Sequence, residues 1–348
     1  MIPGTDIEDD VPLAPRTTLG LGGTARFYLT ARDAGSVAQA IRWARHRGVP
    51  VAILGGGSNL VVPDHGFDGL VIEMAQRGIE DLGGGVTRAA AGEEWDGFVA
   101  RAVAQDLAGI ECLAGIPGRV GATPIQNVGA YGQEVAETIR EVEVLERRTL
   151  SRAVIRGEEC GFGYRDSDFK RDPDTYVVLS VTFALRPGGA PSVRYLELER
   201  AMEGRDASLS DVMQTVLALR RAKSMVIDFA DPNHRSAGSF FTNPIVSSDL
   251  ADRVEGAPRW PMPDGRVKLA AGWLIEQAGF QKGLVRGAVG LSTKHALALV
   301  HHGGGTAEAL LALAEEIRAG VAARFGVTLE LEPRILSAPV DPDGARST

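Results

Sequence analysis

Clusters of glycine inside apolar sequence constrain this chain more than any other feature. The first, GGGSN at residues 55–59, directly follows the apolar run VPVAIL at 49–54, which predicts a buried strand. Glycine adopts backbone conformations closed to other residues and lets a loop approach a ligand closely. Because successive N–H groups in such a loop can bind a phosphate, the cluster indicates either an anion-binding loop or a tight turn without a ligand.

Two common nucleotide-binding motifs do not fit this cluster. A Rossmann fingerprint needs a third glycine and then a helix, whereas LVVPDHG follows here, a segment that is extended and interrupted by Pro63. A P-loop needs GK followed by Ser or Thr, which is absent. A diphosphate bound at this cluster would therefore lie between two strands rather than at the start of a helix.

The composition excludes several other classes of protein. The 43 glycines among 348 residues show no period of three, as collagen would, and the 44% of hydrophobic residues are too many for a low-complexity linker. A formal net charge of -8 disfavours nucleic acid as a partner. Cys112 and Cys160 form no CxxC pair, so we expect free thiols in a reducing compartment and no metal site.

No targeting or membrane segment is indicated. The start, MIPGTDIEDDVPL, is acidic and has no apolar core, so we expect no signal peptide. No apolar run approaches the roughly 18 residues of a membrane helix. We therefore expect a cytoplasmic protein without membrane insertion.

Hydrophobic periodicity predicts an α+β fold. The first part reads as a helix over 36–47 ending at Gly48, a second helix over 94–107, and strands at 49–54, 70–74, 86–91, 139–146 and 176–185. Beyond residue 191 helices dominate, at 208 or 210 to 223, at 269–278, and from the cap Thr306 to Gly326. A strand over 327–336 closes the chain.

The second glycine cluster, AGIPGRVGATPIQNVGAYG at 114–132, is long, apolar and nearly free of charge. Such a segment is unsuited to a solvated linker. It indicates backbone lying against a flat, partly apolar ligand, with the amides of Gln126 and Asn127 available to its heteroatoms. A buried crossover loop with bulges is the alternative.

Three further segments carry polar groups and are equivocal singly. In CGFGYRDSDFK at 160–170, taken alone, we favour a surface loop in which Arg165 is paired locally. In RSAGSFFTNP at 235–244, Ser239 either lies on a pocket floor or begins a strand, and the GxSxG elbow of hydrolases is absent. LELEPRIL puts Glu330 and Glu332 on one face of the predicted strand. His301 and His302 lack metal-ligand spacing and are interpreted as a solvated loop.

The order of these motifs resembles one family. GGGSN, IPGRVGATPIQNVGAYG, YRDSDFK, GSFFTNP, KLAAGWLIEQAG and LELEPRI, spread over residues 17–336, are similar to UDP-N-acetylenolpyruvoylglucosamine reductases, the flavoenzymes of peptidoglycan synthesis. The resemblance implies a two-part FAD-binding domain of the vanillyl-alcohol-oxidase type at 14–75 and 76–200. It also implies a smaller α/β substrate-binding domain at 208–326 and a closing strand at 327–337. The chain departs from the family at His301, where Asn is usual, and at Pro333.

The resemblance also implies an activity: NADPH reduces FAD, and the flavin then reduces the enolpyruvyl group of the UDP-sugar to give UDP-N-acetylmuramate. Arg165 and Glu332 would bind and polarise the enolpyruvyl carboxylate, and Ser239 would donate the proton. The implied cofactor contacts are Leu54, Gly55, Gly56, Gly57, Ser58, Asn59, Ile116, Pro117, Gly118, Gly121, Ala122, Gln126, Asn127, Gly129, Ala130, Tyr131 and Gly132. The implied substrate contacts are Tyr164, Tyr195, Lys223, Asn243, Lys268 and His295.

The chemistry agrees with these roles. An enol ether resists hydride unless its carboxylate accepts the developing negative charge, and Arg165 would supply the cation for it. Glu332 fits only if it shares a proton, which burial would favour by raising its pKa. We expect a monomer. The competing interpretations are a flavoenzyme of the same fold acting on a hydroxy acid or sugar lactone, and a non-catalytic flavin-binding or nucleotide-sugar-binding module.

Overall fold

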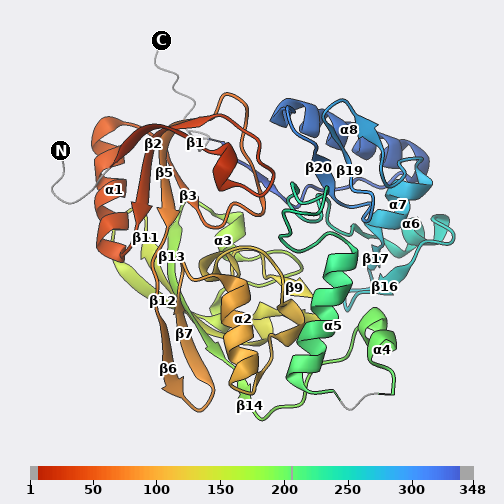
Figure 1. The fold of residues 1–348 in the computed structure, drawn as a ribbon, viewed down its shortest axis with the longest axis horizontal. Coiled ribbons are helices and arrows are strands. Elements are labelled where there is room, and N and C mark those ends of the chain that lie inside the picture. Colours follow the sequence, from red (N-terminus) through yellow and green to blue (C-terminus); the bar gives the residue numbers. More distant parts are fainter. Residues whose placement is uncertain (1–6, 205–206, 338–348) are drawn as a thin grey trace.

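The computed structural model describes residues 7–204 and 207–337, and the chain forms three parts arranged side by side (Figure 1). The N-terminal part is a sheet with strand order β1-β2-β5-β3, made of β1 (Glu8–Pro12), β2 (Thr24–Ala31), β5 (Phe67–Met74) and β3 (Val51–Leu54). β1 runs antiparallel to β2, and the other pairs are parallel. Helix α1 (Ala34–Arg47) connects β2 to β3, so GGGSN lies at the carboxyl end of a parallel strand.

The second part is an antiparallel sheet of long strands. Its order is β12 (Arg152–Arg156), β11 (Ile139–Glu146), β13 (Tyr176–Ala184), β7 (Val86–Ala90) and β6 (Ile79–Gly83). Helix α2 (Trp95–Ala104) and the short helix α3 (Asp168–Arg171) interrupt the strand succession. The two-residue pairs β8 (Leu107–Ala108) with β14 (Arg186–Pro187) and β9 (Gly129–Ala130) with β10 (Gln133–Glu134) complete this part.

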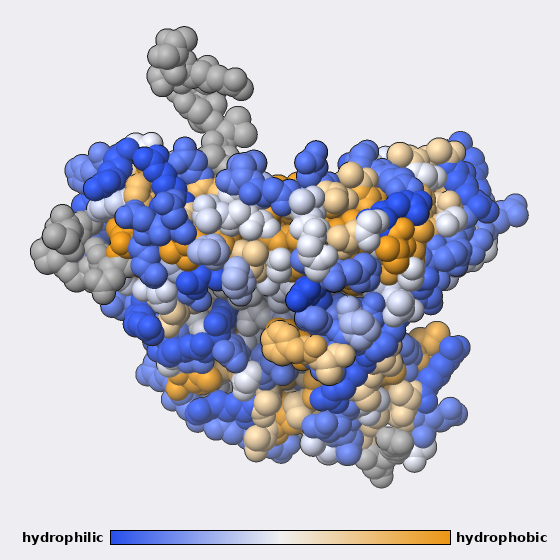
Figure 2. Space-filling model, turned by 45° about the horizontal axis from the view of Figure 1, so that its top comes forward, coloured by the Kyte–Doolittle hydropathy of each residue, from blue (hydrophilic) through white to orange (hydrophobic). Residues whose placement is uncertain are grey.

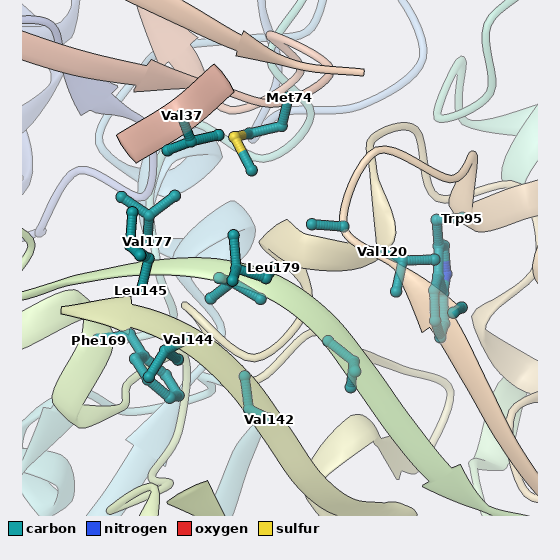
Figure 3. Packing of buried hydrophobic residues seen from close by; sticks show 14 of the residues in the cluster. Val37, Met74, Trp95, Val120, Val142, Val144, Leu145, Phe169, Val177 and Leu179 are labelled. Carbon is teal, nitrogen blue, oxygen red and sulfur yellow. The ribbon is translucent and has the colours of Figure 1, made fainter. Parts of the chain in front are cut away.

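The first two parts share one hydrophobic core. Figure 3 shows Val37 of α1 and Met74 of β5 together with Val177 and Leu179 of β13, and all four belong to one buried cluster. Trp95 of α2 extends this cluster, and its buried indole N–H donates to the Leu113 carbonyl at 3.1 Å. The two sheets therefore fold against each other as one unit.

The third part is smaller and has its own core. It contains two three-stranded sheets. The first has the order β15 (Ile245–Val246), β17 (Val267–Leu269) and β16 (Arg259–Pro261), and the second has the order β18 (Val285–Arg286), β19 (Val289–Leu291) and β20 (Leu299–His301). Helices α6 (Ser248–Arg253), α7 (Ala271–Gln277) and α8 (Ala307–Phe325) pack with them. α8 begins and ends as predicted, because Thr306 caps its first turn and Gly326 closes it at φ 67°.

Helices α4 (Leu196–Met202) and α5 (Leu209–Ala222) lie between the second and third parts. Ser208 caps α5 through a capping box with Asp211, which resolves the two predicted starts. Val212 and Val216 of α5 are buried with Cys112. By these contacts α5 belongs with the second part, whereas the sequence places a domain boundary before it.

The predicted closing strand over 327–336 is wrong for most of its length. Only β21 (Arg334–Ile335) is a strand, paired in parallel with β4 (Leu60–Val61) of the first part. Before it, the Glu332 N–H donates to the Phe240 carbonyl of the third part at 3.0 Å. Pro333 has no N–H and lies where the segment changes partners, so the chain crosses between two parts instead of extending one sheet.

No helix among residues 7–204 and 207–337 is long and apolar enough to cross a membrane. The face in Figure 2 is mostly hydrophilic, with hydrophobic residues in separate areas. Cys112 and Cys160 are both buried and free, as predicted. Burial raises the pKa of each thiol to about 12, so neither is a thiolate at neutral pH.

Candidate functional site

The three parts enclose a cleft of about 630 Å³ lined by both glycine clusters. A smaller cavity of about 130 Å³ adjoins it and shares Gly55, Arg119 and Arg334 with it. The larger volume is typical of a site for a small-molecule ligand or cofactor. All three predicted catalytic residues, Arg165, Ser239 and Glu332, line this cleft.

The first cluster has the properties of an anion-binding loop. Among the described residues, the backbone N–H groups of Gly56, Gly57 and Ser58 donate to no protein acceptor. Gly56 is also a point of close approach, because a Cβ there would lie 2.8 Å from the Cα of Gly118 in the second cluster. Adjacent N–H groups left free beside a cleft are suited to a phosphate.

Asn59 ties this loop to the rest of the site. Its side-chain nitrogen donates to Gln126 Oε1 at 2.6 Å and to the Glu332 carbonyl at 3.1 Å. One amide therefore joins the first cluster, the second cluster and the C-terminal segment. This role is structural and was not apparent from the motif.

Gly57 offers a test of how strictly the loop is fixed. Its φ is 63°, and a Cβ would collide with the Arg16 carbonyl oxygen. Gly48 has nearly the same φ, 64°, with nothing within 4 Å of its Cβ position. We expect Gly48→Ala to destabilise the protein by about 1 kcal/mol through backbone strain alone.

Gly57→Ala is expected to destabilise the protein several times more than Gly48→Ala, because the collision of the new Cβ with the Arg16 carbonyl adds to the backbone strain. Urea unfolding of both variants measures the difference. Equal losses of unfolding free energy would contradict the structure at this loop.

Arg165 is held in a strained conformation by the groups around it. Its φ is 54°, in the region that favours glycine, and Lys170 Nζ donates to its carbonyl at 2.7 Å. Its Nη2 donates to the Gly129 carbonyl at 2.6 Å, and its Nε to Glu332 Oε1 at 3.1 Å. Nη1 donates to no acceptor among the described residues, which leaves it available to a carboxylate ligand.

Glu332 faces the cleft and Glu330 does not. The Glu332 side chain is 14% exposed, whereas Glu330 is exposed, so the two predicted strand neighbours do not share one environment. Burial raises the pKa of Glu332, although Arg165 and Lys170 oppose the rise. This is the direction that a proton-sharing carboxyl group requires.

Ser239 is fixed through its neighbours. Gly238 has a φ of 72° with open space around its Cβ position, and the next residue, Phe240, is fully buried. The Phe240 N–H donates to the Leu297 carbonyl at 2.7 Å, while its carbonyl accepts from Glu332. No described group hydrogen-bonds the Ser239 hydroxyl, so it is available to a ligand in the cleft.

Most of the predicted cofactor residues line the cleft. They are Leu54, Gly55, Gly56, Gly57, Ser58, Asn59, Ile116, Pro117, Gly118, Ala122, Gln126 and Gly129.

The remaining five predicted cofactor residues do not line the cleft. Gly121 borders the smaller cavity, and a Cβ there would lie 2.5 Å from that of Ala91. Asn127 is buried, and its amide donates to Glu134 and to the Gly163 carbonyl. Ala130 ends strand β9, and Tyr131 and Gly132 form the turn of the β9–β10 hairpin, which is not part of the cleft lining.

The predicted substrate residues form two groups outside the described lining of the cleft. In the first, Lys268 Nζ lies 4.6 Å from the centre of the Tyr164 ring, and Arg165 Cζ lies 5.5 Å from it. Asn243 accepts from the N–H of Ala271 at 2.9 Å and so caps α7. This group is contiguous with the predicted catalytic residue Arg165 through Tyr164.

The second group surrounds Lys223. Its Nζ lies 5.6 Å from the Tyr131 ring and pairs with Glu197, while Tyr195 packs edge-on against Tyr131 at 5.5 Å. Burial, reinforced by Lys223, lowers the pKa of His295 to about 4, so His295 is neutral at pH 7. The group therefore offers one cation, a neutral imidazole and an exposed tyrosine.

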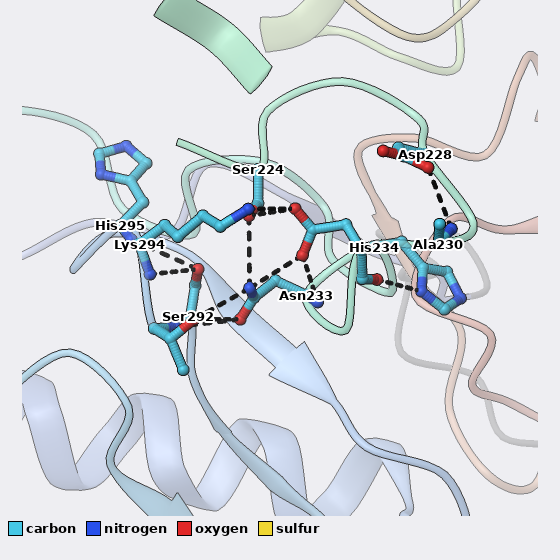
Figure 4. Close-up of polar contacts among 10 residues, drawn as sticks. Ser224, Asp228, Ala230, Asn233, His234, Ser292, Lys294 and His295 are labelled. Atoms are coloured by element: carbon cyan, nitrogen blue, oxygen red, sulfur yellow. Dashed lines mark hydrogen bonds and ion pairs between the residues drawn. The ribbon is translucent and has the colours of Figure 1, made fainter. Parts of the chain in front are cut away.

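A polar network joins the segments that carry the second group (Figure 4). Asp231 accepts from Lys294 Nζ at 2.7 Å and from the Ser224 hydroxyl at 2.8 Å. Asn233 accepts from the N–H of Thr293 at 3.0 Å. The network joins the end of α5, which carries Lys223, to the turn that carries His295.

Asp231 should be important for stability. Burial opposes its ionisation, but hydrogen bonds from Lys294, Asn233 and Ser224 outweigh burial and lower its pKa. We expect Asp231→Asn to lose about 2 kcal/mol of unfolding free energy at pH 7.

The difference from the unmutated protein should shrink as pH falls below about 4, because Asp231 of the unfolded chain then binds a proton that the folded protein, with its lowered pKa, accepts only at lower pH. Thermal unfolding across pH measures it, with Asp264→Asn at an exposed pair as the control. A pH-independent difference would contradict this assignment.

Sequence reasoning missed two arginines that line the cleft, Arg119 and Arg220. Arg119 is the one cation inside the second cluster, which is the signal that could have identified it. Arg220 lies in a helix and has no motif. Burial lowers its pKa to about 10, so it stays charged at neutral pH.

The interpretation of His301 as solvated is wrong. Its side chain is buried, Nδ1 lies 3.1 Å from the Leu19 carbonyl, and Nε2 accepts from the Gly305 N–H. These contacts place the proton on Nδ1 and give His301 a structural role. Among the described residues, no group of three or more His, Cys, Asp or Glu could hold a metal.

Comparisons with known proteins agree with this architecture. Residues 25–148 match the family model of an FAD binding domain, and residues 231–336 match that of the UDP-N-acetylenolpyruvoylglucosamine reductase C-terminal domain. The reductase of that name from Thermobifida fusca (strain YX) is 49% identical, with 94% of this chain and 98% of the relative covered. The Streptomyces coelicolor reductase is also 49% identical, with 93% and 88% covered.

A solved structure is similar over nearly the whole chain. The crystal structure of UDP-N-acetylenolpyruvylglucosamine reductase from Thermus caldophilus superposes with a TM-score of 0.69 at 27% identity, and 96% of this chain and 100% of that chain are covered. The expected α+β fold class, with an FAD-binding domain followed by a smaller domain, is confirmed.

Proposed function

The chain belongs to the UDP-N-acetylenolpyruvoylglucosamine reductase family and is an FAD-dependent oxidoreductase, and we propose that it reduces the enolpyruvyl group of UDP-N-acetylglucosamine enolpyruvate with NADPH as hydride donor. The product is UDP-N-acetylmuramate. The observation that carries this proposal is the convergence of Arg165, Ser239 and Glu332 on the cleft lined by both glycine clusters.

The residues of the cleft fit FAD. The free N–H groups of Gly56, Gly57 and Ser58 suit its diphosphate, and the apolar segment containing Ile116 and Pro117 suits its ring system. Bound FAD would supply the hydride chemistry that the amino-acid side chains lack, taking a hydride from NADPH and passing it to the substrate.

Arg165 binds and polarises the substrate carboxylate. The free Nη1 donates to the carboxylate, while the contacts to Gly129 and Glu332 keep the guanidinium aligned. When hydride reaches the terminal carbon, negative charge develops on this carboxylate, and a cation already in position stabilises it without reorganising.

Glu332 and Ser239 handle protons. Glu332 shares a proton with the substrate carboxylate, because a bare carboxylate would repel the developing charge, and burial raises the pKa of Glu332 in the direction that this role requires. The Ser239 hydroxyl donates a proton to the carbon that has become enolate-like. Its fixed position between Gly238 and Phe240 limits this proton to one face.

The UDP part of the substrate binds to the two groups of predicted substrate residues described above. Lys268 lies against Tyr164 next to Arg165, and Lys223 and Tyr195 lie against Tyr131 in the turn of the β9–β10 hairpin. The two lysines supply local positive charge for a diphosphate on a protein of net charge -8.

Steady-state turnover tests this proposal. NADPH oxidation should depend on the enolpyruvyl UDP-sugar, and mass spectrometry should find a product with two more hydrogen atoms. A hydroxy acid or sugar lactone should not replace the substrate. Turnover of either one, without turnover of the UDP-sugar, would replace this function with the alternative flavoenzyme activity.

A further inference from the structure

Two buried arginine side chains at the cleft each have a nitrogen atom without a hydrogen-bond acceptor. Among the described residues, the only buried side-chain nitrogen or oxygen atoms without a hydrogen bond are the Nε atoms of Arg119 and Arg220. Both arginines line the cleft. A buried donor without an acceptor carries a free-energy cost, and native proteins rarely leave one unsatisfied. The two orphaned donors indicate that cleft arginines acquire an acceptor when a ligand binds.

Arg119 lies where the two glycine clusters meet. A Cβ on Gly55 would be 3.8 Å from Arg119 Cγ, so the stem of Arg119 packs against the first residue of GGGSN. Arg119 also lines both the cleft and the smaller cavity. It therefore lies beside Gly55 and Gly56, where the row of free N–H groups begins.

The ion pair that Arg119 forms in this structure is weak. Nη1 donates to Glu94 Oε1 at 2.9 Å, but the Glu94 side chain is 67% exposed. Arg77 Nη2 lies 3.4 Å from the same Glu94 oxygen, so Glu94 keeps a cation if Arg119 moves. Exposed ion pairs contribute little, and a doubly charged phosphate ligand can compete with one.

The loop itself supplies no charge. The N–H groups of Gly56, Gly57 and Ser58 are dipoles, whereas a dinucleotide diphosphate carries net negative charge. Two other cleft arginines are paired with nearby acids, Arg165 with Glu332 and Arg171 with Asp166 and Asp168. Arg334 lines the cleft at the far end of the loop, where its N–H donates to the Asn59 carbonyl. A cation beside GGGSN would supply this charge, and Arg119 lies beside its first two glycines.

We propose that Arg119 is a diphosphate-binding residue, whose guanidinium exchanges exposed Glu94 for the phosphate oxygens of FAD. This inference rests on the FAD site described above. A charged fork beside a row of N–H groups combines net charge with directional donors, which is the combination that phosphate recognition favours.

Titration of the apoprotein with flavins tests this assignment. FAD carries the diphosphate and riboflavin has none, so flavin fluorescence is followed for both ligands at two salt concentrations. Arg119→Ala should weaken FAD binding about tenfold to a hundredfold and change riboflavin binding by less than about twofold. It should also make FAD affinity less sensitive to salt.

Two control variants separate phosphate binding from the surface ion pair. Arg77→Ala removes the other cation on Glu94 without touching the cleft and should leave FAD affinity unchanged. Glu94→Gln frees Arg119 and should leave FAD affinity equal or tighter. The apoproteins' unfolding temperatures show whether each variant is folded.

The assignment is overturned if Arg119→Ala binds FAD as tightly as the unmutated protein. It is also overturned if FAD and riboflavin lose affinity equally with an unchanged salt dependence, or if Arg77→Ala reproduces the loss. An unmutated apoprotein that binds no FAD would instead count against the FAD site itself, which keeps the two failures distinct.

Discussion

Replacing Ser239 with alanine is expected to slow reoxidation of the reduced flavin by the enolpyruvyl UDP-sugar about 10²-fold or more, the size of a lost general acid. Reduction of the flavin by NADPH should stay nearly unchanged, because this half of the cycle needs no proton on substrate carbon. Anaerobic stopped-flow absorbance measures the two halves separately.

Ser236 provides the matched control for this variant. It lies in the same segment, is buried, and is not among the residues lining the cleft. Ser236→Ala should leave both half-reactions intact. Equal losses in both half-reactions for Ser239→Ala would mean that Ser239 supports the structure of the site and is not the proton donor.

Replacing Arg165 with methionine is expected to slow the same reoxidation step about 10²-fold to 10³-fold, because the developing charge on the substrate carboxylate loses its cation. A second effect follows from the ion pair. Arg165 opposes the burial that raises the pKa of Glu332, so without Arg165 this pKa should rise further. As pH increases, the rate of reoxidation should then begin to fall at a higher pH than in the unmutated protein.

Arg171 is the control for a general loss of positive charge. It also lines the cleft, but it is paired with Asp166 and Asp168. Arg171→Met should slow reoxidation far less than Arg165→Met and should not move the pH profile. Similar losses in the two variants would show that the site needs net charge rather than a guanidinium at Arg165.

Helix-capping residues correctly predicted where two helices begin or end. α1 ends at Gly48 in the left-handed conformation, and α8 lies between its cap Thr306 and Gly326, as expected. The α+β fold class followed from hydrophobic periodicity, and the absence of a helix after GGGSN excluded a Rossmann fingerprint. These features depend on a few neighbouring residues, which a sequence displays directly.

The features that the sequence did not predict depend on contacts between distant segments. The segment containing Glu332 looked like one strand because its apolar residues alternate, but it bonds first to Phe240 and then to β4. His301 looked solvated because its buried acceptor, the Leu19 carbonyl, is far away in the sequence. The contact of Tyr131, a predicted cofactor residue, with the ring of Tyr195 was likewise not apparent from the sequence.

The proposed catalytic residues were predicted by motif, and the structure supplies their arrangement. Arg165 alone suggested a locally paired surface loop, since Asp166 and Asp168 follow it. In the structure those acids pair with Arg171, which leaves Arg165 for Glu332 and a ligand. No pattern in the sequence distinguishes these two pairings.

An anaerobic titration followed by visible absorbance tests the central claim most directly. The purified protein should show flavin bands that NADPH bleaches and that the enolpyruvyl UDP-sugar restores in equal amount, with UDP-N-acetylmuramate formed. A colourless protein that gains no flavin bands with added FAD, or a bleached flavin that the UDP-sugar does not restore, would contradict the account.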